Sequence, residues 1–207
     1  MDAALNTGNY NTKTGNFGIE PKMFALLLGI ASVIMMFAGL TSAYLVKRAN
    51  VDTWIHFNLP KEFLVSCGII LLSSVTLHGA WVFYRKQNRT GYAVMLGTTL
   101  LLGIGFLISQ FAGWSALQSI GIDWVGNPSG GFVYAISWFH AAHIIGGLVI
   151  LLISFVMAIK RMDDPIGDLR STINPEGKLK VKMMCVYWHF VDLLWIYLFL
   201  FLYFNHQ

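Results

Sequence analysis

The sequence predicts an all-α polytopic membrane protein with five transmembrane helices, and its composition and its long apolar runs carry that prediction. Of 207 residues, 56% are hydrophobic and only 12% are charged, whereas a soluble domain carries about 25% charge. The mean hydropathy of +0.62 is too high for a compact water-soluble domain of this size. A soluble enzyme or a nucleic-acid-binding protein is therefore excluded, and no nucleic-acid partner is expected despite the net charge of +4.

Five stretches have the roughly 20 predominantly apolar residues that a membrane-spanning helix needs. They are residues 23–46, 63–84, 92–112, 132–159 and 183–204. The residues before them are polar and rich in Asn, Thr and Gly, without the basic start and apolar region of a signal peptide. No repeat or low-complexity linker interrupts the rest, so we expect a polar tail at 1–21 and a single membrane domain at 22–207.

The basic residues predict the orientation of the five spans. With the N-terminus inside, one side holds eleven of the 14 Lys and Arg residues and the other side three. Basic residues concentrate in cytoplasmic loops. We therefore expect a multi-pass protein of the cell inner (plasma) membrane with a cytoplasmic N-terminus, an outside C-terminus and an outside loop at 113–131.

Asp192 is the one acid deep within a predicted span, at about 15 Å from the inner surface. On a helix it shares a face with Trp188, His189 and Trp195. An ionisable group at this depth indicates either a polar cluster that joins helices or a proton-relay acid. No further acids at other depths extend a relay, which favours the structural role with a bonded partner such as His189.

The histidines in the spans suggest a second kind of site. His78 and His189 are both expected about 10 Å from the inner surface, so a b-type haem between them is one hypothesis. His140 and His143 lie much farther out, where no other span offers an equal-depth histidine. Gln110 and several Ser, Thr and Gly residues are expected instead to form tight seams between helices.

Three segments resemble subunit III of the haem-copper oxidases. The most specific runs from Tyr187 to Trp195, with the sequence YWHFVDLLW, and is similar to the closing helix of that family. The segment 139–147, FHAAHIIGG, and the weaker segment 36–45, MFAGLTSAYL, add to the likeness. Five spans with an outside C-terminus fit the shorter, five-helix form of the family.

The resemblance implies a non-catalytic subunit of a proton-pumping terminal oxidase in aerobic respiration. Such a chain holds no haem, copper or other metal of its own. It assembles with oxidase subunits I and II in a hetero-oligomeric complex, binds phospholipid in a cleft between its helices and supports sustained proton uptake, with cytochrome c or quinol as electron donor to the complex. The structural and lipid-cleft candidates are then His78, Gln110, His140, His143, Trp188, His189, Asp192 and Trp195.

Three family acids are replaced in this chain, by Val33, Gly113 and Lys182. Without these three acids, proton collection of the kind proposed for the family has no support in this chain. Asp192 and the histidines remain as candidates in the spans. The loss of the acids also leaves open a second hypothesis, that the chain is an oxidase-III-like protein associated with nitric-oxide reductase. A b-type membrane cytochrome or a transporter is the third.

Overall fold

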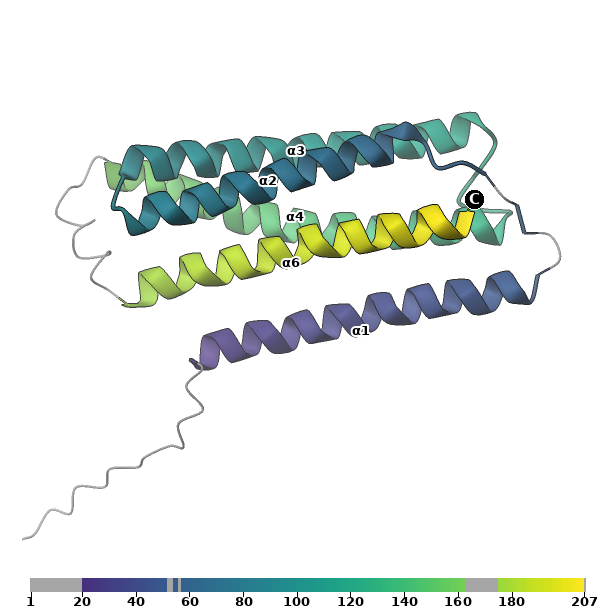
Figure 1. Ribbon diagram of the computed structural model, residues 1–207, viewed down its shortest axis with the longest axis horizontal. Coiled ribbons are helices and arrows are strands. Elements are labelled where there is room, and N and C mark those ends of the chain that lie inside the picture. Colours follow the sequence, from purple (N-terminus) through teal and green to yellow (C-terminus); the bar gives the residue numbers. More distant parts are fainter. Residues whose placement is uncertain (1–19, 52–53, 56, 163–174, 207) are drawn as a thin grey trace, which may run out of the picture.

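The computed structural model describes residues 20–51, 54–55, 57–162 and 175–206, and within them it contains five α-helices and no strand (Figure 1). The helices are α1 (Pro21–Ala49), α2 (Lys61–Arg85), α3 (Arg89–Ser119), α4 (Pro128–Met162) and α6 (Pro175–His206). All five are long and apolar enough to cross a membrane. The predicted all-α fold with five transmembrane helices is confirmed, and the tail at 1–19 lies outside the described residues.

Every helix extends beyond the apolar run that predicted it. The largest difference concerns the expected outside loop at 113–131, which is wrong in its extent. Helix α3 continues to Ser119 and α4 already begins at Pro128. Residues such as Ser115 and Gln118 are compatible with helix, so the helix ends only near Gly121, whose φ of 79° suits glycine.

Turn chemistry explains the shortest connection, between α2 and α3. Gln87 adopts a left-handed φ of 57°. The side chain of Asn88 then caps α3 by accepting a hydrogen bond from the Gly91 amide at 2.9 Å. Two long helices are thereby joined as an antiparallel hairpin.

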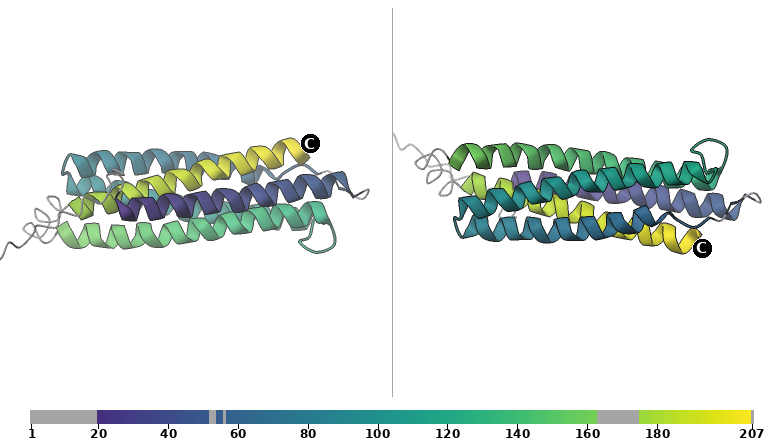
Figure 2. Two further views of the ribbon diagram at one scale, coloured as in Figure 1. Left: turned by 90° about the horizontal axis from the view of Figure 1, so that it is seen from below. Right: turned by 90° about the horizontal axis from the view of Figure 1, so that it is seen from above.

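Four of the helices form a closed bundle, and the fifth packs on its side. Helix α3 lies between α2 and α4, α6 closes the ring between α4 and α2, and α1 contacts α4 and α6 (Figures 1 and 2). Consecutive helices run in opposite directions. Helix α6 is the most buried of the five spans, and α1 is the least.

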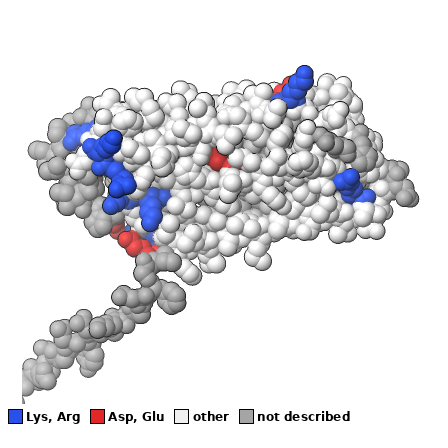
Figure 3. All heavy atoms as spheres, in the orientation of Figure 1, with Lys and Arg blue, Asp and Glu red and all other residues white. Residues whose placement is uncertain are grey.

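Charged side chains gather towards the two ends of the bundle, and the broad band between them is uncharged except for one small acidic patch near mid-length (Figure 3). The starts of α1 and α6 and the α2–α3 turn share one end (Figure 1). An ion pair between Lys22 and Glu176, 3.0 Å long, joins α1 and α6 there. This end also holds Arg85, Lys86 and Arg89, so the charge pattern still favours a cytoplasmic location for it.

We expect Gln87→Cys, in the α2–α3 turn, to react with a membrane-impermeant thiol reagent in inside-out vesicles and not in intact cells. Ser119→Cys, at the opposite end of α3, is the matched control and should show the reverse. The native Cys67 and Cys185 lie within the helices and are replaced by serine or alanine in both variants. Labelling of Gln87→Cys in intact cells would contradict the orientation.

Candidate functional site

Two buried tryptophans of α6 bind two serines of α2 through hydrogen bonds. The Trp188 indole N–H donates to the Ser73 hydroxyl at 2.8 Å, and that of Trp195 donates to Ser66 at 3.0 Å. Both pairs are seven residues apart, or about 10.5 Å along each helix. The two bonds therefore fix the antiparallel register of α6 against α2.

Trp188 fills a slot between α3 and α4. A Cβ atom added to Gly103 of α3 would lie 3.1 Å from the Trp188 ring, and one added to Gly147 of α4 would lie 3.0 Å from it. Glycine at these positions lets both backbones approach the indole, which is 1% exposed. One side chain of α6 thus contacts the other three helices of the bundle.

Trp195 organises the outer half of the bundle in a similar way. The Ser66 hydroxyl that it binds also accepts a hydrogen bond from Gln110 of α3, at 3.0 Å. Its ring stacks on His140 of α4, with centroids 4.9 Å apart, and meets the edge of Phe106. Three helices again converge on one indole, and this cluster contains Gln110, which was expected in a helix seam, together with His140.

His140 is completely buried in an aromatic cage, and neither ring nitrogen has a hydrogen-bond partner among the described residues. His143, one turn further along α4, binds the Phe139 carbonyl through Nδ1 at 2.7 Å. Its own backbone carbonyl accepts a hydrogen bond from Tyr187 of α6 at 3.0 Å. The two histidines are therefore in different environments, and the structure does not bring them together with His78.

His78 and His189 do meet across the α2–α6 contact, as their matched depth predicted. Their ring centroids lie 6.5 Å apart. The hydroxyl of Ser74 and Nδ1 of His189 are 2.6 Å apart and share a hydrogen bond. This bond and the neighbouring Trp188–Ser73 bond hold α2 directly against α6, so a macrocycle between the two helices would break both.

The expected bond between Asp192 and His189 is wrong. Asp192 is 3% exposed, and both of its carboxylate oxygens are buried within the chain. They face Ser74 of α2, whose hydroxyl also shares a hydrogen bond with His189, and they make none with His189 itself. A spacing of three residues put both side chains on one helix face, but each turns to the facing helix instead of to the other.

Sequence reasoning placed Ser73 and Ser74 in helix seams and overlooked Ser66. The signal that identifies it is the matched interval of seven residues between Ser66 and Ser73 on α2 and between Trp188 and Trp195 on α6. Two serines at that interval can each accept a hydrogen bond from one of the two indole N–H groups on an antiparallel helix.

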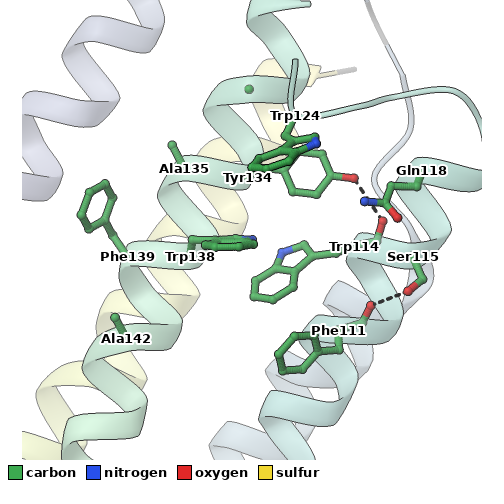
Figure 4. Close-up of a pocket in the computed structure, with 11 residues that line it drawn as sticks. Phe111, Trp114, Ser115, Gln118, Trp124, Tyr134, Ala135, Trp138, Phe139 and Ala142 are labelled. Carbon is green, nitrogen blue, oxygen red and sulfur yellow. Dashed lines mark hydrogen bonds between the residues drawn. The ribbon is translucent and has the colours of Figure 1, made fainter. Parts of the chain in front are cut away.

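A first cleft, with a volume of about 700 Å³, lies between the end of α3 and the beginning of α4 (Figure 4). Its wall is mostly aromatic, with Trp114, Trp124 and Trp138 side by side and Gln118 at its polar edge (Figure 4). The Trp114 N–H donates to Ser137 of α4 at 2.9 Å, which fixes the inner wall.

A second cleft, of about 530 Å³, lies between α1, α4 and α6 towards the basic end. Its wall is apolar, with residues such as Leu26 and Ile153, and Lys180 contributes a cationic side chain. Tyr187 and Gly146 form part of its floor. An apolar slot beside a cation matches the shape of an anionic lipid.

In the part of the chain that the structure describes, no three His, Cys, Asp or Glu side chains come together as a metal-binding group. Both cysteines, Cys67 and Cys185, are free.

Known proteins to which this chain is similar share one name. A protein of Corynebacterium diphtheriae named cytochrome c oxidase subunit 3 is 29% identical over 194 residues, covering 89% of each chain. A Nocardia farcinica protein with that name, qualified as probable, is 30% identical over 192 residues and also covers 89% of each. The chain belongs to the cytochrome c oxidase subunit 3 family.

A longer relative from Rickettsia prowazekii, also named a probable cytochrome c oxidase subunit 3, is 31% identical over 154 residues. The match covers 74% of this chain and 50% of the relative. No family model matches the chain. The resemblance seen in the sequence is confirmed, and this oxidase subunit is a multi-pass membrane protein.

We expect Gly147→Ala to destabilise the bundle by about 1–3 kcal/mol, because the new methyl group overpacks the Trp188 ring. Gly105→Ala is the matched control on α3, since nothing lies within 4 Å of a Cβ there. It should be neutral or stabilising by roughly 0.5–1 kcal/mol. The midpoint of thermal unfolding of the purified protein measures both, and equal midpoints would contradict the slot.

We also expect the purified chain to contain no stoichiometric haem, iron or copper. Direct contact between α2 and α6 at His78 and His189 leaves no space between the helices for a porphyrin. The measurement is a reduced-minus-oxidised spectrum of the isolated chain together with metal analysis. A b-type band that disappears in His78→Ala or His189→Ala would overturn this expectation.

Proposed function

We propose that this chain is the non-catalytic subunit III of a proton-pumping haem-copper oxidase that takes electrons from cytochrome c. Family membership is the observation that carries the proposal. The structure supports it because polar side chains in the described spans join helices to one another, as Trp188 does with Ser73 and Trp195 with Ser66. Haem and copper then belong to subunits I and II, on which this chain packs in the cell inner (plasma) membrane.

The names of the relatives favour this function over association with nitric-oxide reductase. The three missing family acids nevertheless change how the chain can support proton uptake. Gly113 packs closely on Phe63: a Cβ there would lie 3.0 Å from its ring, so a side chain at this position requires the Phe63 ring to shift. We infer that sustained turnover in this chain depends mainly on rigidity and bound lipid.

The cleft between α1, α4 and α6 is our candidate for the phospholipid site. Its apolar wall suits an acyl chain, and Lys180 lies where a phosphate of the inner leaflet would be. Basic pockets between transmembrane helices on the cytoplasmic side bind anionic head groups. A lipid here would fill the space that α1 leaves beside the bundle.

We expect Lys180→Gln to reduce co-purified anionic phospholipid by about one molecule per chain, because the head group loses its counter-charge. Lys182→Gln is the matched control: it is also exposed and belongs to the same stretch of α6, but it does not line the cleft. Lipid mass spectrometry of both preparations provides the measurement. Equal lipid content in the two variants would rule out this site and leave membership of the oxidase untouched.

Asp192→Asn should harm assembly or durability of the oxidase more than its initial rate. The amide brings N–H donors into a position that is 3% exposed, and a buried donor without an acceptor costs about 1–3 kcal/mol. That cost can loosen a subunit without stopping chemistry in another chain. Subunit content, initial oxygen consumption and proton release are measured in one preparation. Full retention of the subunit with immediate loss of pumping would identify Asp192 as a relay acid and contradict the proposal.

A further inference from the structure

The seam between α2 and α6 carries polar side chains on its outer surface, at a depth where lipid offers no hydrogen bond. His78 is exposed, His189 is half-buried beside it, and Ser74 connects His189 with the neighbourhood of Asp192. We call these four residues the seam cluster. They follow one another along the contact from the inner third of the bundle to its middle.

The depth of the cluster follows from its position on α6. Asp192 is 17 residues after the start of this helix and 14 before its end, or about 25 and 21 Å from the two ends. Among the described acids it alone lies far from a helix end. Figure 3, which views the side of the molecule that α2 and α6 face, shows a small acidic patch near mid-length in an otherwise uncharged band.

The hydrogen bonding of the cluster is incomplete within the chain. The described residues provide no hydrogen bond to the exposed His78 ring, whereas the Asp192 carboxylate is buried beneath the seam and faces Ser74. Hydroxyl groups elsewhere on the surface differ, since Ser32 and Thr98 return their hydrogen bonds to carbonyls of their own helices. The seam cluster thus presents, at His78, a polar group that an acyl chain leaves unsatisfied.

The residues around the cluster limit what can cover it. Val75 and Leu193, which flank it on α2 and α6, are both 67% exposed. His78, the exposed member of the cluster, lies seven residues or about 10 Å before the end of α2 at Arg85, below the level of phospholipid head groups. A water-soluble partner would not reach a patch in the apolar band. A transmembrane helix with a hydrogen-bonding side chain at this depth satisfies both conditions.

We propose that the α2–α6 seam is the surface on which this subunit docks against a transmembrane helix of the catalytic subunit. That helix supplies a hydrogen-bond donor or acceptor to the exposed His78 ring beside His189. The inference rests on the proposed function, because it takes its partner from the oxidase complex. It adds the face that is used and the chemistry that selects the partner helix. The apolar surface of α3, which includes Leu101, faces lipid.

Site-specific photo-crosslinking in the native complex tests the proposal. A benzophenone amino acid replaces Val75 or Leu193 on the seam, and Leu101, which is 71% exposed on α3, is the matched control. After illumination of membranes, the complex is purified through a tag on this chain. We expect adducts with a larger oxidase subunit from both seam positions and none with protein from Leu101.

Other outcomes overturn the inference in distinguishable ways. Lipid adducts alone from the seam, in a complex that retains the oxidase subunits, show that this face meets lipid. An adduct of twice the mass of this chain shows that a second copy covers it. If no oxidase subunit co-purifies with the unmodified tagged chain, the proposed function itself fails, and the inference fails with it.

A second measurement separates docking from exposure to lipid. His78→Leu removes a polar group, which would leave retention unchanged or improved if the face met hydrocarbon. We expect the opposite, a roughly five- to tenfold faster loss of the subunit in detergent, as for one lost hydrogen bond between helices. Thr98→Leu on α3 is the polar-to-apolar control and should leave retention unchanged. Equal retention of the two variants contradicts docking at the seam.

Discussion

The hydrogen bonds from Trp188 and Trp195 to Ser73 and Ser66 are the interaction on which the rest of the bundle depends. Between helices in a membrane there is no hydrophobic driving force, so close packing and hydrogen bonds hold them together. Each indole adds both, because its N–H binds α2 at 2.8 or 3.0 Å while its ring packs against α3 and α4. Helix α6 is therefore central to the bundle although it is last in the chain.

The glycines follow from the same constraint. A tryptophan ring occupies the centre of a four-helix bundle only if the facing helices have no side chain there, as at Gly103 and Gly147. Gly113 does the same for Phe63 between α2 and α3. The position where relatives of this family commonly carry an acid is thus used for close packing here. A gain in contact between helices replaces whatever that acid contributes elsewhere.

Much of this fold could be predicted from the sequence because length and hydropathy determine spans directly. The pairing of His78 with His189 also followed, since depth along an antiparallel helix is set by residue count. Other details depend on rotation about the helix axis, which residue count does not fix. Asp192 and His189 share a face by spacing, yet the facing helix draws His189 to Ser74. Ser66 was missed because a lone serine in a span has no distinctive pattern until its partner helix is known.

The two sides of α6 satisfy their polar groups to different degrees. Towards the interior, the indole N–H groups of Trp188 and Trp195 are bonded within the chain. Towards the α2 seam, His189 is bonded to Ser74, whereas the ring of His78 lies exposed beside it. In a soluble protein water would bond to that ring, but within the bilayer another protein side chain or a trapped water must do so. The polar group that stays open on this outer seam is therefore the place where a neighbouring helix can add a hydrogen bond.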